Sequence, residues 1–354
     1  MTDLEKLCLR VTEAADCAVI TDDVNRRYFT AMKSSAGTLV VFPEKAYFII
    51  DFRYIEKAKK TVTACEVILQ DKLCEQINSL IEKHGAKTVS VNADTCTLSE
   101  LIAYQQKLNA EVIADTKLAE IIREIRTVKS QEQIDKIIKA QRIAEKGFAH
   151  MLDFIKVGRT EKEIQLELDY YMLKNGAEAL SFDTIALSGS NTSLPHGVPS
   201  DKKVESGEFV LMDFGATYDG WHSDMTRTVC VGKPSDKMKS VYGTVLTAQL
   251  TALDAVKAGM SGKALDKIAR DIITEAGYGD NFGHSLGHGV GVEIHESPYA
   301  SPSREDILPE NSIVTVEPGI YLEGKFGVRI EDFVVVTENG CINMTKAPKE
   351  LICL

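Results

Sequence analysis

The sequence predicts a two-domain protein in which an α/β domain over residues 1–125 precedes an α+β domain with an internal duplication over residues 126–354. Three observations predict this. A chain of 354 residues is more than twice as long as a typical single domain. Apolar runs of strand length alternate with helical stretches in the first part of the chain. In the second part, a pair of helices followed by a hairpin occurs twice.

The first domain is indicated by short apolar runs that lie between helical stretches. TLVVF (38–42), YFII (47–50) and VIL (67–69) are rich in β-branched and aromatic residues, as strands are. Alternation of such runs with helical segments is typical of a small α/β domain. A polar segment follows over residues 123–129, and we place the domain boundary in it, near Arg126.

The second domain begins with helices whose starts repeat. Ser130 and Thr160 each stand three residues before a Gln or Glu, which is the capping-box signature of a helix start. The segments KVGRTEKEI (156–164) and KAGMSGKAL (257–265) share lysine, glycine, a hydroxyl residue, lysine and an aliphatic residue in the same order, about a hundred residues apart. Two similar helix junctions can arise by chance, but the hairpins that follow repeat at a similar distance. We therefore expect an internal duplication.

Each helical pair is followed by a predicted hairpin that contains acidic residues. In the first hairpin (209–229), Asp219-Gly220 is a strong signal for a two-residue turn. This turn pairs Asp213 with Thr226 and makes Asp224 a diagonal neighbour of Asp213 on the same face. Both carboxylates are therefore expected to point the same way.

The second hairpin (315–333) repeats this arrangement. If its turn centres on Gly324, Glu317 faces Glu331 across the ladder. Like charges in such positions destabilise a sheet, and acids beside apolar runs are costly to bury without a partner. One interpretation is a solvated acidic face on each hairpin. The other is that the hairpins converge and that two divalent cations balance the four carboxylates; the matching layout of the two pairs favours it.

Histidine placement supports a metal site near these acids. Five of the 7 histidines lie within or between the hairpins, namely His196, His222, His284, His288 and His295. Three of them fall in the glycine-rich stretch 284–296, which favours loop or strand over helix. The zinc-helix motif His-Glu-x-x-His is absent. A single histidine is more often structural, but three beside an acidic cluster indicate a site.

These residues lie in motifs that resemble those of the pita-bread metallopeptidases, the family of aminopeptidase P, prolidase, methionine aminopeptidase and creatinase. The motifs are MDFG (212–215), HSDMTRT (222–228), SLGHGVGVEIHE (285–296), TVEPGIY (315–321) and GVRIEDF (327–333). The resemblance covers residues 126–354 and implies an α+β pita-bread catalytic domain with a pseudo-twofold internal duplication. Residues 25–41 and the DFRY segment (51–54) look like the accessory domain of aminopeptidase P and prolidase. Residues 1–125 are therefore expected to form a creatinase/prolidase-type N-terminal domain.

The resemblance also implies a role for each candidate residue. It implies that two metal ions are bound by five residues, namely Asp213, Asp224, His288, Glu317 and Glu331. Of these, Asp224 and Glu331 are implied to bridge the two ions. The resemblance also implies that His196 and His295 line the substrate side, and we expect both to be catalytic, together with Glu317, which the chemistry of such a site suggests as a proton relay. We expect His284 and Arg329 to contact the substrate or to support the ligands. Arg329 lies on the same strand face as Glu331, and we expect it to orient that carboxylate rather than to bind the carboxylate of a ligand. Four carboxylates and one imidazole favour Mn²⁺, with Co²⁺ or Zn²⁺ as alternatives.

The implied activity is metal-dependent hydrolysis of the peptide bond before proline, with a proline-containing peptide as substrate. An Xaa-Pro aminopeptidase, which releases the N-terminal residue, is favoured because of the N-terminal domain with its DFRY segment. An Xaa-Pro dipeptidase (prolidase) is the alternative. A noncatalytic pita-bread scaffold is a more remote one, and the complete ligand set argues against it. The prolyl ring needs an apolar pocket. The apolar residues near the motifs that could line it are Phe182, Trp221, Tyr321 and Val328. For each of them we nevertheless favour packing in the core.

Charge and hydropathy argue against nucleic acids and membranes as partners. The formal net charge of −11 disfavours binding to nucleic acid or to an anionic membrane surface. No apolar run approaches the roughly 18 residues of a membrane span, and the opening segment MTDLEKLCLR does not look like a secretory leader. We therefore expect a cytoplasmic protein. Relatives with this accessory domain are dimers or tetramers, so the resemblance implies a homodimer or a larger homo-oligomer.

Overall fold

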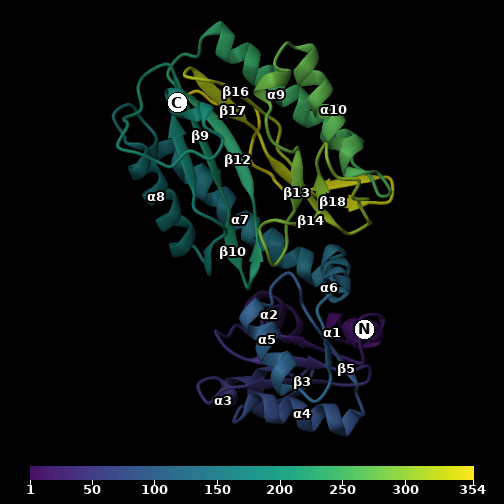
Figure 1. Ribbon diagram of the computed structural model, residues 1–354. Coiled ribbons are helices and arrows are strands. Elements are labelled where there is room, and N and C mark those ends of the chain that lie inside the picture. The colour runs from purple at the N-terminus through teal and green to yellow at the C-terminus, as the bar shows by residue number, and fades with distance from the viewer. The chain divides into compact units, whose positions relative to one another are not determined.

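The computed structural model describes residues 1–354. The chain forms two compact units, Met1–Arg126 and Thr127–Leu354. The first unit is purple to blue in Figure 1, and the second runs from teal to yellow. None of the helices combines the length and the apolar character needed to cross a membrane.

The first unit is built on a six-stranded mixed sheet with the strand order β4-β3-β2-β1-β5-β6. Helices α1, α2, α3 and α6 pack on one apolar cluster of the sheet, and α4 and α5 pack on the other. Because residues of β1, β2 and β3 alternate between the two clusters, both faces of the sheet are covered. The predicted α/β domain is confirmed. Its elements are α1 (Asp3–Arg10), β1 (Cys17–Ile20), α2 (Asp23–Thr30), β2 (Thr38–Val41), β3 (Ala46–Ile50), α3 (Ile55–Thr61), β4 (Glu66–Leu69), α4 (Leu73–His84), β5 (Thr88–Val91), α5 (Leu98–Lys107), β6 (Glu111–Ile113) and α6 (Lys117–Thr127).

The segment that leads out of the first unit is helical where the sequence suggested only a polar connection. Helix α6 continues through residues 123–127. Leu118, Ile122 and Ile125 are buried in the first unit, because they recur at the spacing of one helix face. The polar residues between them therefore belong to the outer face of a helix and not to a linker.

The second unit contains the two predicted helical pairs with their predicted starts. Ser130 and Thr160 form capping boxes, and Ser235 and Ser261 cap the corresponding helices of the second pair. The helices are α7 (Gln131–Phe154), α8 (Glu161–Lys174), α9 (Asp236–Ala255) and α10 (Gly262–Glu275). The strands are β7 (Ala179–Leu180), β8 (Ile185–Ser188), β9 (Glu208–Phe214), β10 (Ala216–Tyr218), β11 (Trp221–His222), β12 (Met225–Val231), β13 (Gly287–Gly289), β14 (Glu296–Ala300), β15 (Ile313–Val316), β16 (Gly319–Leu322), β17 (Phe326–Arg329), β18 (Asp332–Thr337) and β19 (Gly340–Asn343).

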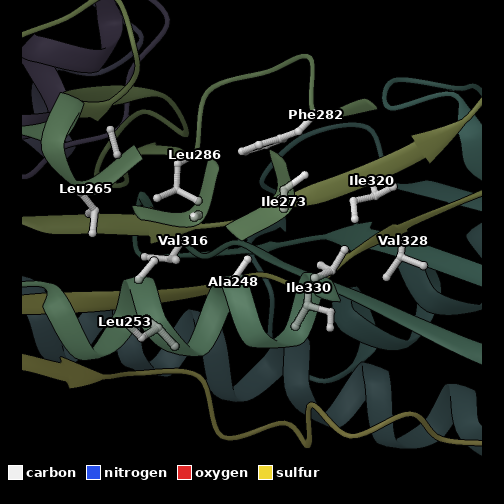
Figure 2. Packing of buried hydrophobic residues seen from close by; sticks show 14 of the residues in the cluster. Ala248, Leu253, Leu265, Ile273, Phe282, Leu286, Val316, Ile320, Val328 and Ile330 are labelled. Carbon is white, nitrogen blue, oxygen red and sulfur yellow. The ribbon is translucent and has the colours of Figure 1, made fainter. Parts of the chain in front are cut away.

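The two halves of this unit have the same construction. In the first half α7 and α8 pack against the sheet β12-β9-β8, and in the second half α9 and α10 pack against the sheet β15-β18-β19. Figure 2 shows the second of these cores, in which Ala248 of α9, Leu265 of α10 and Val316 of β15 belong to one cluster. The predicted internal duplication is confirmed.

Candidate metal centre

The first hairpin has the predicted register. Thr226 pairs with Asp213, and Tyr218 pairs with Trp221 across the predicted turn. Between these two pairs the ladder breaks, and Asp224 lies in the break, between β11 and β12. Gly215 makes the break possible, because a Cβ atom there would lie 1.9 Å from the carbonyl oxygen of Ser223.

The second hairpin also has its predicted register and breaks in the same way. Val316 pairs with Asp332 on one side of the break, and Gly319 pairs with Arg329 on the other. Glu317 and Glu331 face each other within the break. The N–H of Glu331 donates to the carbonyl oxygen of Thr226 (3.1 Å), in the first hairpin. The two breaks are thus joined, and the four carboxylates converge.

All nine predicted site residues line one cavity of about 480 Å³ in the second unit. They are His196, Asp213, Asp224, His284, His288, His295, Glu317, Arg329 and Glu331. This volume is within the range of pockets that hold small molecules and short peptides. The fifth histidine singled out by position, His222, is on β11 and does not line the cavity; its Nδ1 lies 3.3 Å from the Thr217 hydroxyl.

Three of these side chains form a compact set of donors. One atom each from Asp224, His288 and Glu331 lies within 4.8 Å of the other two. His288 Nε2 is 3.6 Å from Asp224 Oδ2 and 3.3 Å from Glu317 Oε1. Its Nδ1 donates to the carbonyl oxygen of Gly289 (3.0 Å), so Nε2 is the nitrogen that can coordinate an ion.

Two buried carboxylate oxygens in the cavity have no hydrogen-bond partner. They are Asp213 Oδ1 and Glu331 Oε1. The other oxygen of Asp213 accepts from Arg329 Nη2 (2.5 Å), and the other oxygen of Glu331 accepts from the Thr226 hydroxyl (2.7 Å). Buried polar atoms are seldom left without a partner. A divalent cation bound by oxygen would satisfy both, so the donor set fits a metal site.

Electrostatics point the same way. Burial and the neighbouring carboxylates raise the pKa values of Asp224 and Glu331 well above their ordinary range. Burial opposes ionisation of Glu317 too, but its hydrogen bond to His288 lowers the pKa of Glu317 to about 2. The same contact outweighs burial at His288 and raises its pKa to about 9. The cavity thus holds more acidic groups than it can ionise without added positive charge.

Arg329 contacts a carboxylate of the candidate ligand set, but its direct partner is Asp213 and not Glu331, which it was expected to orient. It forms a buried ion pair with Asp213, while its Nε donates to Thr226 (3.0 Å) and its Nη1 to the Tyr321 hydroxyl (2.7 Å). The link to Glu331 is indirect, because the Thr226 hydroxyl accepts from Arg329 and donates to Glu331. The rule that alternate residues of a strand share one face does not apply here, because the ladder breaks between residues 329 and 331.

The remaining histidines occupy different positions around the cavity. His295 packs edge-to-face on His288 with ring centres 4.4 Å apart, and burial together with His288 lowers the pKa of His295. His284 Nδ1 donates to the carbonyl oxygen of Ser285 (2.8 Å), so its Nε2 accepts from the Tyr321 hydroxyl (2.9 Å). His196 is exposed at the cavity edge.

Of the apolar side chains considered for a prolyl pocket, only Phe182 lines the cavity. Val328 belongs to the second core, and Tyr321 is a hydrogen-bonding partner of Arg329 and His284. Thr226 is a site residue for which no role was predicted, although its predicted pairing with Asp213 was a usable signal. Arg227, buried beside it, had no such signal.

Known proteins resemble this chain over nearly its whole length. The model of metallopeptidase family M24 matches residues 135–338, and that of the creatinase/prolidase N-terminal domain matches residues 10–128. An uncharacterized peptidase of Bacillus subtilis is 45% identical over 343 residues, 96% of each chain, and an Xaa-Pro dipeptidase of Pyrococcus furiosus is 39% identical over 352 residues, 99% of each. Among solved structures, an Xaa-Pro dipeptidase from Bacillus anthracis has a TM-score of 0.96 at 41% identity over 99% of both chains. An X-Pro aminopeptidase from Thermotoga maritima has a TM-score of 0.91 at 39% identity over 96% of this chain and 98% of its own.

Proposed function

Because this chain belongs to metallopeptidase family M24 and carries a creatinase/prolidase N-terminal domain, we propose that it hydrolyses the peptide bond before proline in short peptides. The predicted combination of an α/β domain and a pita-bread domain is confirmed by these matches and by the structural relatives. The chain is an enzyme of a family that depends on two metal ions.

The observation that carries this proposal is the convergence of four carboxylates and an imidazole on one cavity, with two buried carboxylate oxygens unpartnered. The residues proposed to hold the ions are Asp213, Asp224, His288, Glu317 and Glu331. Bound divalent ions lower the pKa of water and polarise a carbonyl group. Mn²⁺ is the proposed ion because carboxylate oxygens dominate the set.

The side chains around the ligands suggest how the substrate is handled. Glu317, with a pKa of about 2, is ionised at neutral pH, and it is proposed to relay a proton. Its Oε1 accepts from the Thr315 hydroxyl (3.1 Å), which fixes its direction. His295, whose pKa is lowered by burial and by His288, is neutral near pH 7. Its ring N–H, together with that of His196, is proposed to stabilise negative charge that develops on the carbonyl oxygen.

The preferred substrates can be dipeptides or longer peptides. Relatives from Pyrococcus furiosus and Pyrococcus horikoshii, and the protein of the Bacillus anthracis structure, are Xaa-Pro dipeptidases. We propose Xaa-Pro dipeptides as the preferred substrates on this ground. Xaa-Pro aminopeptidase activity, which the N-terminal domain led us to expect, is the second candidate, and the Thermotoga maritima structure supports it.

Product analysis tests the proposal. Manganese-loaded protein is incubated with Ala-Pro and with Ala-Pro-Ala, each with and without a chelator, and the products are identified by mass spectrometry. Chelator-sensitive cleavage of Ala-Pro in preference to the tripeptide is the expected result. Preferential release of alanine from the tripeptide would establish the aminopeptidase instead. Cleavage of neither peptide by protein with confirmed bound metal would contradict both.

We expect metal binding to release protons. The pKa of His288 is raised to about 9, so this group carries a proton at neutral pH that an ion must displace. Burial and the neighbouring carboxylates raise the pKa values of Asp224 and Glu331 well above the ordinary range, so these groups hold their protons to a higher pH than free carboxyl groups do. Metal affinity should therefore fall as the pH falls. Calorimetric titrations with Mn²⁺ at pH 7 in two buffers of different ionisation enthalpy measure this release. Equal apparent enthalpies in the two buffers would contradict the prediction.

A further inference from the structure

Glu161, the first residue of α8, is a fully buried carboxylate that does not line the cavity. Its Oε1 accepts from the backbone N–H (2.7 Å) and the hydroxyl (3.2 Å) of Ser188. Its Oε2 accepts from the backbone N–H (3.0 Å) and the hydroxyl (2.7 Å) of Ser200. Asn191 Nδ2 donates to both oxygens, at 3.0 and 3.2 Å. All of these partners are donors, and a charged acceptor makes such bonds stronger than neutral ones.

The two serines are the ends of one segment that reaches the cavity. Residues 188–200 leave the end of β8 and pass through a short 3-10 turn (Gly189–Ser193). They then place Pro195 and His196 in the cavity wall. One carboxylate therefore ties together both ends of this segment. The exposed His196 ring makes no hydrogen bond, so its position depends on the backbone that carries it.

We propose that Glu161 is a positioning residue that holds the 188–200 segment so that His196 faces the substrate side of the cavity. This inference rests on the proposed function, in which His196 acts on the substrate. The location of Glu161 suits the role, because the N-terminus of a helix stabilises a negative charge. The middle of the segment is held separately, by the hydrogen bond from the Gly327 N–H to the Thr192 hydroxyl (2.7 Å). Loss of the Glu161 contacts should therefore loosen the segment ends without unfolding the domain.

The Glu161→Gln variant tests this with little change of shape. An amide NH₂ group would face the donors of Ser188 or Ser200, so one end of the segment would be released. We expect kcat/KM for Ala-Pro to fall about 10- to 100-fold, with an unchanged metal content. In metal-free protein we expect faster amide hydrogen exchange confined to residues 188–200. Glu163→Gln is the matched control, because Glu163 lies on the same helical turn and its hydrogen bonds, from Thr160 and Arg159, are exposed. This variant should keep the wild-type kcat/KM and the wild-type hydrogen exchange.

Combination with His196→Ala separates positioning from a general loss of stability. If Glu161 acts through His196, adding Glu161→Gln to His196→Ala should lower kcat/KM by less than about twofold more. Losses that multiply would overturn the proposal, and so would wild-type hydrogen exchange at residues 188–200 in Glu161→Gln. If that variant does not fold, Ser200→Ala, which removes one donor, should give a smaller loss with the same dependence on His196. Should the wild-type protein fail to cleave Xaa-Pro peptides, the proposed function fails, whereas the exchange experiment still decides whether Glu161 holds the segment.

Discussion

Asp224→Asn is expected to abolish both metal binding and peptide hydrolysis. Asp224 belongs to the compact donor set together with His288 and Glu331. The amide of asparagine takes one negative charge and one oxygen donor away from this set. Loss of a residue that only supports a ligand costs roughly 10- to 100-fold, so loss of a proposed ligand should cost more. The bound metal after dialysis, measured by elemental mass spectrometry, and kcat/KM for Ala-Pro give the two readouts.

Asp219→Asn provides the matched control for this variant. Asp219 belongs to the same hairpin, but its side chain is 56% exposed and pairs with Lys136. Its backbone φ of 49° is a conformation that Asn adopts readily. We expect full metal content and activity in Asp219→Asn. Retention of both by Asp224→Asn would show that the metal site has been assigned to the wrong residues.

Arg227→Met is expected to reduce the free energy of unfolding of the second unit by about 3–5 kcal/mol. Arg227 Nη2 forms an ion pair with Asp332 (2.7 Å) in which both side chains are almost fully buried. Its Nε and Nη2 also donate to the carbonyl oxygens of Pro348 (2.9 Å) and Ala347 (2.8 Å). Methionine fills similar space but leaves these acceptors without their donor. Urea unfolding of metal-free protein, followed by fluorescence of Trp221, measures the change in the second unit, because Trp221 is the single tryptophan.

The effect of Arg227→Met should depend on pH in a defined direction. Burial alone would raise the pKa of Asp332, but Arg227 and Lys349 outweigh it and lower the pKa below the ordinary value of 3.8. A carboxyl group whose folded pKa is depressed stabilises the fold above its unfolded pKa and loses that contribution as the pH falls through the folded pKa. The difference between wild type and variant should thus be largest near neutral pH and shrink below pH 3.8. Lys267→Met, which breaks an exposed pair with Asp271, should cost less than about 1 kcal/mol; an equal cost for both variants would contradict the argument.

Local signals were enough to predict the arrangement of the acids. The turns at Asp219-Gly220 and at Gly324 fix the register of each hairpin, and the register decides which residues face each other across the ladder. The resulting pairs, Asp213 with Thr226 and Glu317 opposite Glu331, follow from the observed registers. The capping boxes at Ser130 and Thr160 depend on only four residues each, which is why helix starts were also predictable.

Contacts between the hairpins could not be predicted from such local signals. The partner of Arg329 is Asp213, 116 residues away, and this contact depends on how the two hairpins cross. The same is true of Arg227 with Asp332 and of Glu161 with the ends of the 188–200 segment. In each case the sequence shows the charged residue, and only the tertiary arrangement identifies what it binds.

A manganese titration of the metal-free protein, with Ala-Pro hydrolysis as the readout, tests the central claim most directly. If two ions held by the converging carboxylates are required, the metal-free protein should be inactive. Activity should then rise to a plateau at two equivalents of Mn²⁺ and disappear again when a chelator is added. Ala-Pro hydrolysis that is undiminished in metal-free protein would contradict the account.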